Sequence, residues 1–482
     1  MPQIQIREHQ IIRVIMPTRT IKNHTTETIT KNLMKKILYL SLLLIPLFNQ
    51  AQIISTSDAA VLFSGDEHYG TARFEALSGA FGALGGDMSA TEINPAGLGI
   101  FLNNESALSL AYRETKINTS FYNNTIKNSD QYLNFSQAGG VLVFNIDDNS
   151  NWRHVALGFN YSIVNDFSNS FIMEGNSGIP DFLEDPFLNS DSNNSNDVFY
   201  NQVDGQSFIN TTSGLNDKFT FSLAANYNDK LYYGFSISTY NLDYNQIADL
   251  AESNHDGFGN TLDASLIQNL FTTGTGFSVG FGIISKPIDA VRMGIAYRSP
   301  IWYNLTDIYT DDLQINVSNN ADAFTDVTDG IFDYKLSTPS TLTGSFAYLF
   351  GKAGLVSIDY TYKDYQNTKL RPTAVFMTEN QDLATNLRGA SQLKIGTEWR
   401  FDLMSIRGGY SYEQSPYNNS LSSENLTGYS LGLGYYIGKR SKLDFAYTNT
   451  KHSQPYAFLQ ASDAGNLDIE NSRITATLVI GF

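Results

Sequence analysis

The last ten residues of the chain, Arg473-Ile474-Thr475-Ala476-Thr477-Leu478-Val479-Ile480-Gly481-Phe482, decide the fold class. Every second side chain is apolar, from Ile474 to Phe482, while the side chains between them are mostly small or polar. Successive side chains of a β-strand point to opposite faces, so this pattern indicates a strand with one apolar face.

The same alternation recurs along the chain and predicts fourteen strands. They lie near residues 106–116, 132–146, 152–165, 214–228, 230–244, 272–285, 289–306, 332–350, 353–366, 390–401, 403–413, 427–438, 441–450 and 471–482. Alternation alone would also fit a soluble sandwich, so the connections between the strands decide. Every second connection is short, at 147–151, 229, 286–288, 351–352, 402 and 439–440. The intervening ones are long, including 166–213, 245–271, 307–331 and 367–389.

Short turns at one end and long loops at the other are typical of an outer-membrane β-barrel. An even number of strands lets the first pair with the last and removes both sheet edges. We therefore predict an all-β fold, a 14-stranded antiparallel transmembrane β-barrel over residues 106–482, in the cell outer membrane with its long loops outside. A terminal aromatic residue after such a strand is what the barrel assembly machinery usually recognises, so we expect that machinery as a partner.

Composition agrees with a membrane barrel. Charged residues are only 16%, against about a quarter in soluble proteins, while 28 Tyr and 31 Phe are present. No apolar stretch beyond residue 51 reaches the ~20 residues that a membrane helix needs. The net charge of −17 argues against nucleic acid as a partner, because phosphates repel such a chain.

The N-terminal region has the pattern of a secretory signal. Residues 1–33 have no apolar periodicity and are predicted to be an over-extended start. Met34-Lys35-Lys36, the apolar run 37–48 and the small residue Ala51 predict a signal peptide over 34–51. The alternative is a disordered cytoplasmic leader.

A segment rich in glycine and alanine precedes the first strand. Residues 52–105 include the run Ser78–Asp87 and then Asn94-Pro95-Ala96-Gly97. A barrel of fourteen strands is wide enough to have an interior that must be filled. We therefore expect residues 52–105 to fold into the lumen as an N-terminal hatch.

This segment resembles the hatch of the FadL/TodX-type family of outer-membrane transporters for hydrophobic compounds. Asn94, Pro95 and Ala96 match the Asn-Pro-Ala signature of that hatch, while segments 298–300 and 338–340 resemble other recurring family segments. The resemblance implies passive diffusion of long-chain fatty acids or hydrocarbons through a hatch-gated barrel. It also implies an opening through the side of the wall. We expect the motif to seat the hatch against the wall beside a gap or kink in an early strand, with 152–165 the best candidate. The alternative is that it only forms the turn that ends the hatch.

Two sets of residues are candidates for ligand binding. The predicted loop 245–271 carries apolar residues at helical spacing that could line an outer groove: Leu262, Leu266, Ile267, Leu270 and Phe271. Alternatively, that helix packs on other loops. A second apolar cluster in the loop 166–213 allows both interpretations: Ile179, Phe182, Leu183, Phe187 and Leu188.

Several charges fall on the lumen side of their predicted strands. They are Arg292, Arg298, Asp359, Lys363, Lys394, Glu398, Arg407, Asp444 and Arg473. Among the basic ones, Arg292, Arg298, Lys394 and Arg407 are the candidates for binding a fatty-acid carboxylate. The alternative is a set of ion pairs that stiffens the wall and holds the hatch.

The sequence favours a transporter over an enzyme. Beyond the signal there are four histidines (His68, His154, His255 and His452) and no motif that unites them with a nucleophile. The Ser/Asn/Asp run at 189–197 lacks the spacing of a calcium loop. We expect no catalytic residues, no metal and no cofactor. The expected partners are hydrophobic small molecules, lipopolysaccharide and outer-membrane lipid, with the protein as a monomer. The long polar loop 166–213 departs from the family, so the alternative function is a shuttle protein of a secretion system that binds exported proteins with its loops.

Overall fold

The computed structural model describes residues 54–146, 150–187, 198–438, 440–459 and 463–482. The predicted over-extended start and signal peptide therefore lie outside the described residues. Among the described residues, no helix is long and apolar enough to cross a membrane. The strands are β1 (Glu105–Phe121), β2 (Asn124–Asn145), β3 (Trp152–Asp166), β4 (Asn169–Gly175), β5 (Gln202–Tyr227), β6 (Leu231–His255), β7 (Thr261–Ile288), β8 (Val291–Arg298), β9 (Trp302–Val317), β10 (Phe324–Ser337), β11 (Thr341–Leu349), β12 (Gly354–Asp364), β13 (Lys369–Arg371), β14 (Gly389–Phe401), β15 (Met404–Glu413), β16 (Leu426–Tyr436), β17 (Ser441–Tyr456) and β18 (Gly465–Gly481).

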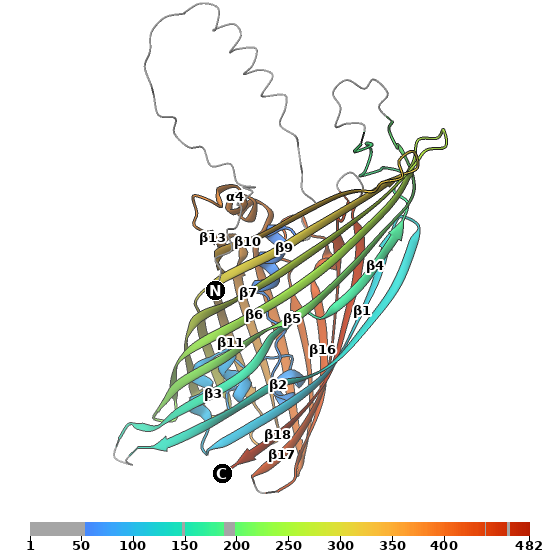
Figure 1. Ribbon diagram of the computed structural model, residues 1–482. Helices are drawn as coiled ribbons and strands as arrows, with labels where there is room; N and C mark the ends of the chain where they lie inside the picture. Colours follow the sequence, from blue (N-terminus) through green and yellow to red (C-terminus); the bar gives the residue numbers. More distant parts are fainter. Residues whose placement is uncertain (1–53, 147–149, 188–197, 439, 460–462) are drawn as a thin grey trace, which may run out of the picture. The chain divides into compact units, whose positions relative to one another are not determined.

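These segments form one closed antiparallel barrel of fourteen wall strands, which confirms the predicted fold class (Figure 1). Four wall strands are each broken into two segments, namely β3 with β4, β8 with β9, β10 with β11, and β12 with β13. The barrel closes where β1 pairs with β18, from Glu105 opposite Gly481 to Ser120 opposite Asn466. Closure leaves no sheet edge between the first and last strands.

Two of the breaks lie opposite each other and carry prolines, which cannot donate to a ladder. Pro300 separates β8 from β9, and Pro339 separates β10 from β11. Ile301 and Thr338 rejoin the two strands there, because the Ile301 N–H donates to Thr338 Oγ1 at 2.9 Å and the Thr338 N–H to the Ile301 carbonyl at 3.0 Å. The two segments that resemble family segments thus face each other across one point of the wall.

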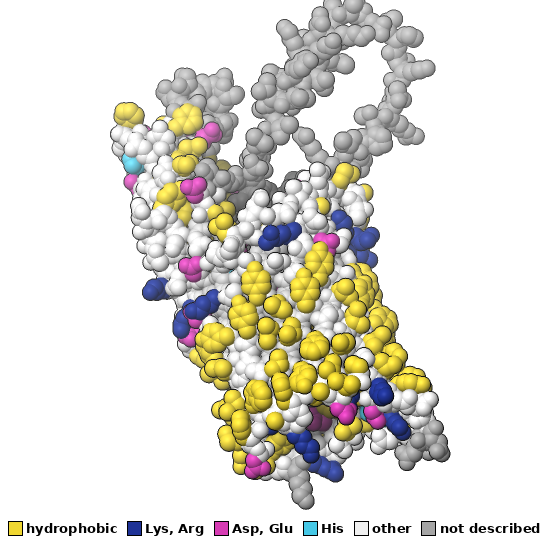
Figure 2. Space-filling model, turned by 180° about the vertical axis from the view of Figure 1, so that it is seen from behind, with side chains coloured by type: hydrophobic (Ala, Val, Ile, Leu, Met, Phe, Trp, Pro, Cys, Tyr) yellow, Lys and Arg dark blue, Asp and Glu magenta, His cyan; other side chains and the backbone are white. Residues whose placement is uncertain are grey.

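The two faces of the wall differ as the alternation predicts. In β5, Phe219, Phe221 and Leu223 are exposed on the outside, while the residues between them are buried toward the lumen. Apolar side chains form a band around the outer face seen in Figure 2. The nine charges predicted on the lumen side are all buried or half-buried. The outer face is therefore that of a membrane-spanning barrel.

The barrel has a turn end and a loop end. The short connections 228–230, 289–290, 350–353 and 402–403 share the turn end with the start of β1 and the end of β18. At the loop end, the strands run much further than predicted, so the predicted loops at 245–271 and 307–331 are largely strand, and 166–213 contains β4 and the start of β5. For example, β6 and β7 are joined only by residues 256–260.

The predicted helix within 245–271 is wrong. Its apolar residues lie on β7, where Leu262 pairs with Asn254 of β6 and with Val317 of β9. The helical spacing arises because both faces of this strand carry apolar residues: Leu262 is buried inside, whereas Phe271 is exposed outside. The helix in this half of the chain is instead α4 (Met377–Asn386), in the connection between β13 and β14. The 3-10 turns η3 (Tyr365–Asn367) and η4 (Ser422–Glu424) also lie in loop-end connections.

The hatch fills the lumen, as predicted. It contains α2 (Thr56–Ser64), α3 (Ala72–Ala76), and the 3-10 turns η1 (Met88–Glu92) and η2 (Pro95–Ile100). Most of its side chains beyond residue 68 are buried. The sequence interpretation missed α2, although Ser55 and Asp58 carry its signal: the Asp58 N–H donates to the Ser55 hydroxyl at 3.1 Å, as in an N-cap.

Candidate functional site

The Asn-Pro-Ala motif joins two parts of the hatch to the wall. Asn94 caps η2, because its Oδ1 accepts from the Ala96 N–H at 3.0 Å, and Pro95 takes the first helical position. The Asn94 amide also donates to the Gly82 carbonyl in the hatch at 2.7 Å and to the Ile283 carbonyl of β7 at 3.3 Å. One buried side chain therefore fixes the hatch turn, the hatch core and the wall.

Glycines in the wall form the seat for this motif. A Cβ atom on Gly282 of β7 would lie 1.8 Å from Asn94 Oδ1, and one on Gly234 of β6 would lie 2.1 Å from the Ala96 nitrogen. Neither position has room for any side chain. The close approach of the two backbones at this seat depends on glycine.

The position predicted for the motif is therefore wrong. It contacts β6 and β7, not the strand at 152–165. That strand, β3, contacts the residues that follow the motif: Leu98 packs over Gly158, and His154 Nε2 lies 2.8 Å from the Gly99 carbonyl. The sequence shows no signal for which wall strand carries the seat, because Asn94 and Gly282 are brought together only by barrel closure.

The charged side chains of the hatch are mainly acidic, and the lumen wall provides basic ones. Glu92 pairs with Lys218 at 2.8 Å, and Glu75 with Arg473 at 3.0 Å. Asp66 lies 3.6 Å from Arg298. Ion pairs with strands on different sides of the lumen hold the hatch as a charge-complementary plug.

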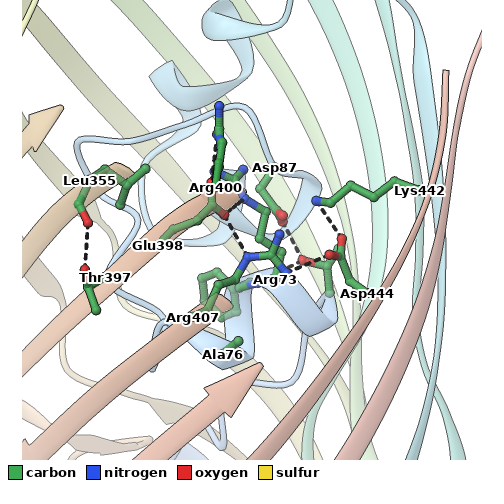
Figure 3. Close-up of polar contacts among 12 residues, drawn as sticks. Arg73, Ala76, Asp87, Leu355, Thr397, Glu398, Arg400, Arg407, Lys442 and Asp444 are labelled. Carbon is green, nitrogen blue, oxygen red and sulfur yellow. Dashed lines mark hydrogen bonds and ion pairs between the residues drawn. The ribbon is translucent and has the colours of Figure 1, made fainter. Parts of the chain in front are cut away.

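A denser network fixes the hatch at the turn end (Figure 3). Arg73 of α3 pairs with Glu398 of β14 at 2.7 Å. Glu398 also accepts from Arg407 at 2.7 Å, and Arg407 reaches Asp444 at 2.6 Å. Glu398 and Asp444 are almost fully buried. A buried carboxylate held by several guanidinium groups is costly to separate from any one of them.

The four predicted lumen charges have different partners. Arg298 and Arg407 are used in the ion pairs just described, and Arg292 donates to the Leu84 carbonyl of the hatch. This is the ion-pair role that the sequence left open as the alternative. Lys394 is buried on β14, opposite Asp359, and forms no ion pair or hydrogen bond with any described residue.

The wall has a seam between β2 and β3. Their ladder ends where Gln137 pairs with Ser162, and β3 then bulges between Ile163 and Asn165. Beyond this point, β4 pairs with β5, and β2 pairs with β1 alone. Side chains bridge the seam instead, as where Asp130 accepts from the Ser170 N–H at 2.7 Å. The predicted kink near 152–165 is thus present, although the motif lies elsewhere.

A packed cluster of apolar side chains, here called the apolar chamber, lies beside this seam, toward the loop end. Phe63 of α2 packs edge-on against Phe167 and Tyr244, with ring centroids 6.1 and 5.6 Å apart. Val164 of the β3 bulge and Leu383 of α4 belong to the same cluster. The N-terminal helix of the hatch therefore occupies the chamber and contacts the loop-end helix α4.

The candidate groove residues divide between two faces of β7. Leu262, Leu266 and Leu270 face inward, whereas Ile267 and Phe271 face outward, so they cannot line one groove. In the second cluster, Phe182 and Phe187 pack on buried residues of β7 and β9, while Ile179 and Leu183 are exposed. Leu188 and the run 189–197 lie outside the described residues. Among the described residues, no group of three or more acidic or histidine side chains could hold a metal ion.

Comparison with solved structures identifies the fold. The chain matches a Pseudomonas aeruginosa FadL homologue with a TM-score of 0.53 at 13% identity, over 87% of this chain and 100% of that chain. It matches the P. putida toluene transporter TodX with a TM-score of 0.55 at 16% identity, over 86% and 99%. The CymD monoaromatic hydrocarbon channel gives 0.51 at 15%, over 86% and 97%. The fold is that of the FadL-type barrels.

The sequence itself gave no match to any family model and none to curated proteins. At these identities, the FadL-type likeness shows a shared fold, and function must be argued from the site. The fold predicted from the hatch motif is confirmed.

Proposed function

We propose that this protein is an outer-membrane channel through which hydrophobic compounds, such as long-chain fatty acids or aromatic hydrocarbons, diffuse passively under the control of the hatch. The observation that carries the proposal is the apolar chamber next to a seam in the wall. The solved barrels of the same fold include a toluene transporter and a monoaromatic hydrocarbon channel. In our proposal, the protein is a monomer, is inserted by the barrel assembly machinery, and is surrounded by lipopolysaccharide and outer-membrane lipid.

The chamber and the seam define a path. An apolar ligand in the chamber would replace the α2 side chains, of which Phe63 is the largest. Val164 and Phe167 line the chamber and also belong to the β3 bend where the ladder with β2 has ended. Parting side chains such as Asp130 and Ser170 breaks fewer hydrogen bonds than parting a backbone ladder. The ligand would leave sideways into the membrane.

Lys394 is the candidate contact for a carboxylate. It is buried and forms no hydrogen bond or ion pair within 4.0 Å with any described residue, although the carboxylates of Asp66, Asp359 and Glu413 lie near it, whereas Arg292, Arg298 and Arg407 are already engaged. A bound carboxylate would give it a direct, charge-assisted hydrogen bond. Lys394 would then distinguish fatty acids from neutral hydrocarbons.

The seam can be locked by a disulfide, because the chain contains no cysteine. We expect Asp130→Cys with Ser170→Cys to stop uptake of long-chain fatty acids or toluene when oxidised and to restore it when reduced. The matched control is Ser120→Cys with Thr125→Cys, which joins β1 and β2 where they are already paired. Uptake that continues through an oxidised seam would exclude the sideways path. If cells with and without the protein take up these compounds equally, the channel function itself is excluded.

One observation favours the alternative, a shuttle that binds exported proteins. Phe258, at the tip of the β6–β7 hairpin, is 94% exposed. Its turn is preformed, because the Phe258 and Asn260 N–H groups both donate to Asp256 Oδ1. An exposed aromatic residue on a rigid turn is typical of a protein-binding surface. Phe258→Ser should weaken binding of an exported protein without changing uptake.

A further inference from the structure

A hollow of ≈ 460 Å³ lies on the outer face of the wall, separate from the hatch and its seat. It is formed by β5, β6, β7 and β9, which run side by side on the near face in Figure 1. Its volume is within the roughly 300–1,000 Å³ usual for small-molecule sites.

Two rows of side chains line the hollow, and the lower row, which lies nearer the turn end, is aromatic. Strand pairing puts Phe219 opposite Thr239, Thr239 opposite Phe277, and Phe277 opposite Trp302. The three aromatic side chains are 41%, 50% and 38% exposed, and the rings of Phe277 and Trp302 lie 4.9 Å apart. Since Thr239 is much smaller than its neighbours, the row has a notch between Phe219 and Phe277.

The upper row, which lies nearer the loop end, is polar, and apart from Asp217 at one end it is uncharged. One residue pair closer to the loop end, Asn241 lies opposite Thr275, and Thr275 opposite Asn304. Asn241 and Asn304 form no side-chain hydrogen bond with any described residue, so both amides are available to a ligand. The hollow therefore has an aromatic row toward the turn end and a polar row toward the loop end.

The charges around the hollow select against an anionic ligand. Asp217 lies opposite Asn241, and Asp243 is one pair further toward the loop end. No lysine or arginine lines the hollow. A phosphate would meet carboxylates and no compensating cation.

We propose that this hollow binds an uncharged saccharide carried on an alkyl or acyl chain, as in a neutral glycolipid of the leaflet at the loop end. The sugar hydroxyls bond to Asn241, Asn304 and Thr275, while the apolar face of the ring stacks on the aromatic row. The alkyl chain runs down through the Thr239 notch onto the apolar band. This binding site lies outside the lumen, so it does not depend on the channel function.

Trp302 provides the probe. The chain has three tryptophans, so Trp152→Phe with Trp399→Phe leaves Trp302 as the only one. This variant is placed in phosphatidylcholine nanodiscs and titrated with dodecyl maltoside brominated on its chain. We expect quenching of Trp302 fluorescence at a several-fold lower mole fraction than with brominated phosphatidylcholine or phosphatidylglycerol. Asn241→Ala with Asn304→Ala, or Thr239→Phe, should remove that preference.

A matched control keeps Trp399 instead, through Trp152→Phe with Trp302→Phe, and should show no preference among the brominated molecules. Equal quenching of Trp302 by all three probes would overturn the proposal, as would stronger quenching by the anionic lipid. A preference that survives the Asn241/Asn304 double variant would also overturn it. Free maltose that displaces the alkyl maltoside at equal concentration would show that the chain contributes nothing, which contradicts a glycolipid site.

Discussion

Replacing Gly282 by alanine should release the hatch from its seat. The new Cβ atom would lie 1.8 Å from Asn94 Oδ1 and 3.1 Å from Pro95 Cδ, so the motif must move away from β7. Overpacking of this kind costs about 1–3 kcal/mol. The shift also strains the Asn94 hydrogen bonds to Ile283 and Gly82, worth about 0.5–1.5 kcal/mol each. Together these terms weaken hatch docking by about 2–6 kcal/mol, and the middle of that range, about 3–4 kcal/mol, corresponds to ~10²–10³-fold in the undocked population.

Thiol labelling measures that population. Ser89 of η1 is fully buried, so Ser89→Cys is labelled by a polar maleimide only when the hatch leaves its seat. We expect the labelling rate to rise ~10²–10³-fold in the Gly282→Ala background, in proportion to the undocked fraction. Gly344→Ala is the matched control, because a Cβ atom there meets nothing within 4 Å. An unchanged labelling rate in a correctly folded Gly282→Ala barrel would refute the seat as the anchor of the hatch.

Three further predictions follow from the ion pairs and the orientation of the barrel. Glu398→Gln leaves buried guanidinium groups without their carboxylate and should lower the free energy of unfolding, measured by denaturant titration, by about 3–5 kcal/mol. Glu470→Gln, at a partly exposed pair with Lys451, should lower it by at most about 1 kcal/mol. Equal losses would contradict the role of the buried network. Lys394→Met should slow uptake of long-chain carboxylates but not of toluene, whereas Lys451→Met should change neither uptake rate. If Lys394→Met slows uptake of both compounds equally, Lys394 only supports the fold. Chymotrypsin added to intact cells should cut at Phe258 and leave the turn-end connections intact. Cleavage at those turns first would show that the turn end, and not the loop end, faces outside the cell.

The sequence by itself determined the class of fold and the sidedness of each strand. Alternation with period two is a local property of extended backbone, so it showed which side chains face lipid and which face the lumen. The wall strand that contains Arg407 was predicted within a residue or two at each end, and Arg407 was correctly assigned to its lumen face. The Asn94-Pro95 cap is also local, because it needs only the following two residues.

Only the tertiary structure decided what depends on contacts between distant parts of the chain. Residues 262–271 have the spacing of a helix, but pairing with β6 and β9 on both sides makes them a strand. The seat is formed when barrel closure brings Gly282 to Asn94, and no local pattern encodes that meeting. Arg298 and Arg407 form ion pairs because the carboxylates of Asp66, Glu398 and Asp444 reach them in the folded barrel. The positions of the hatch carboxylates follow from packing in the lumen and not from their spacing along the chain.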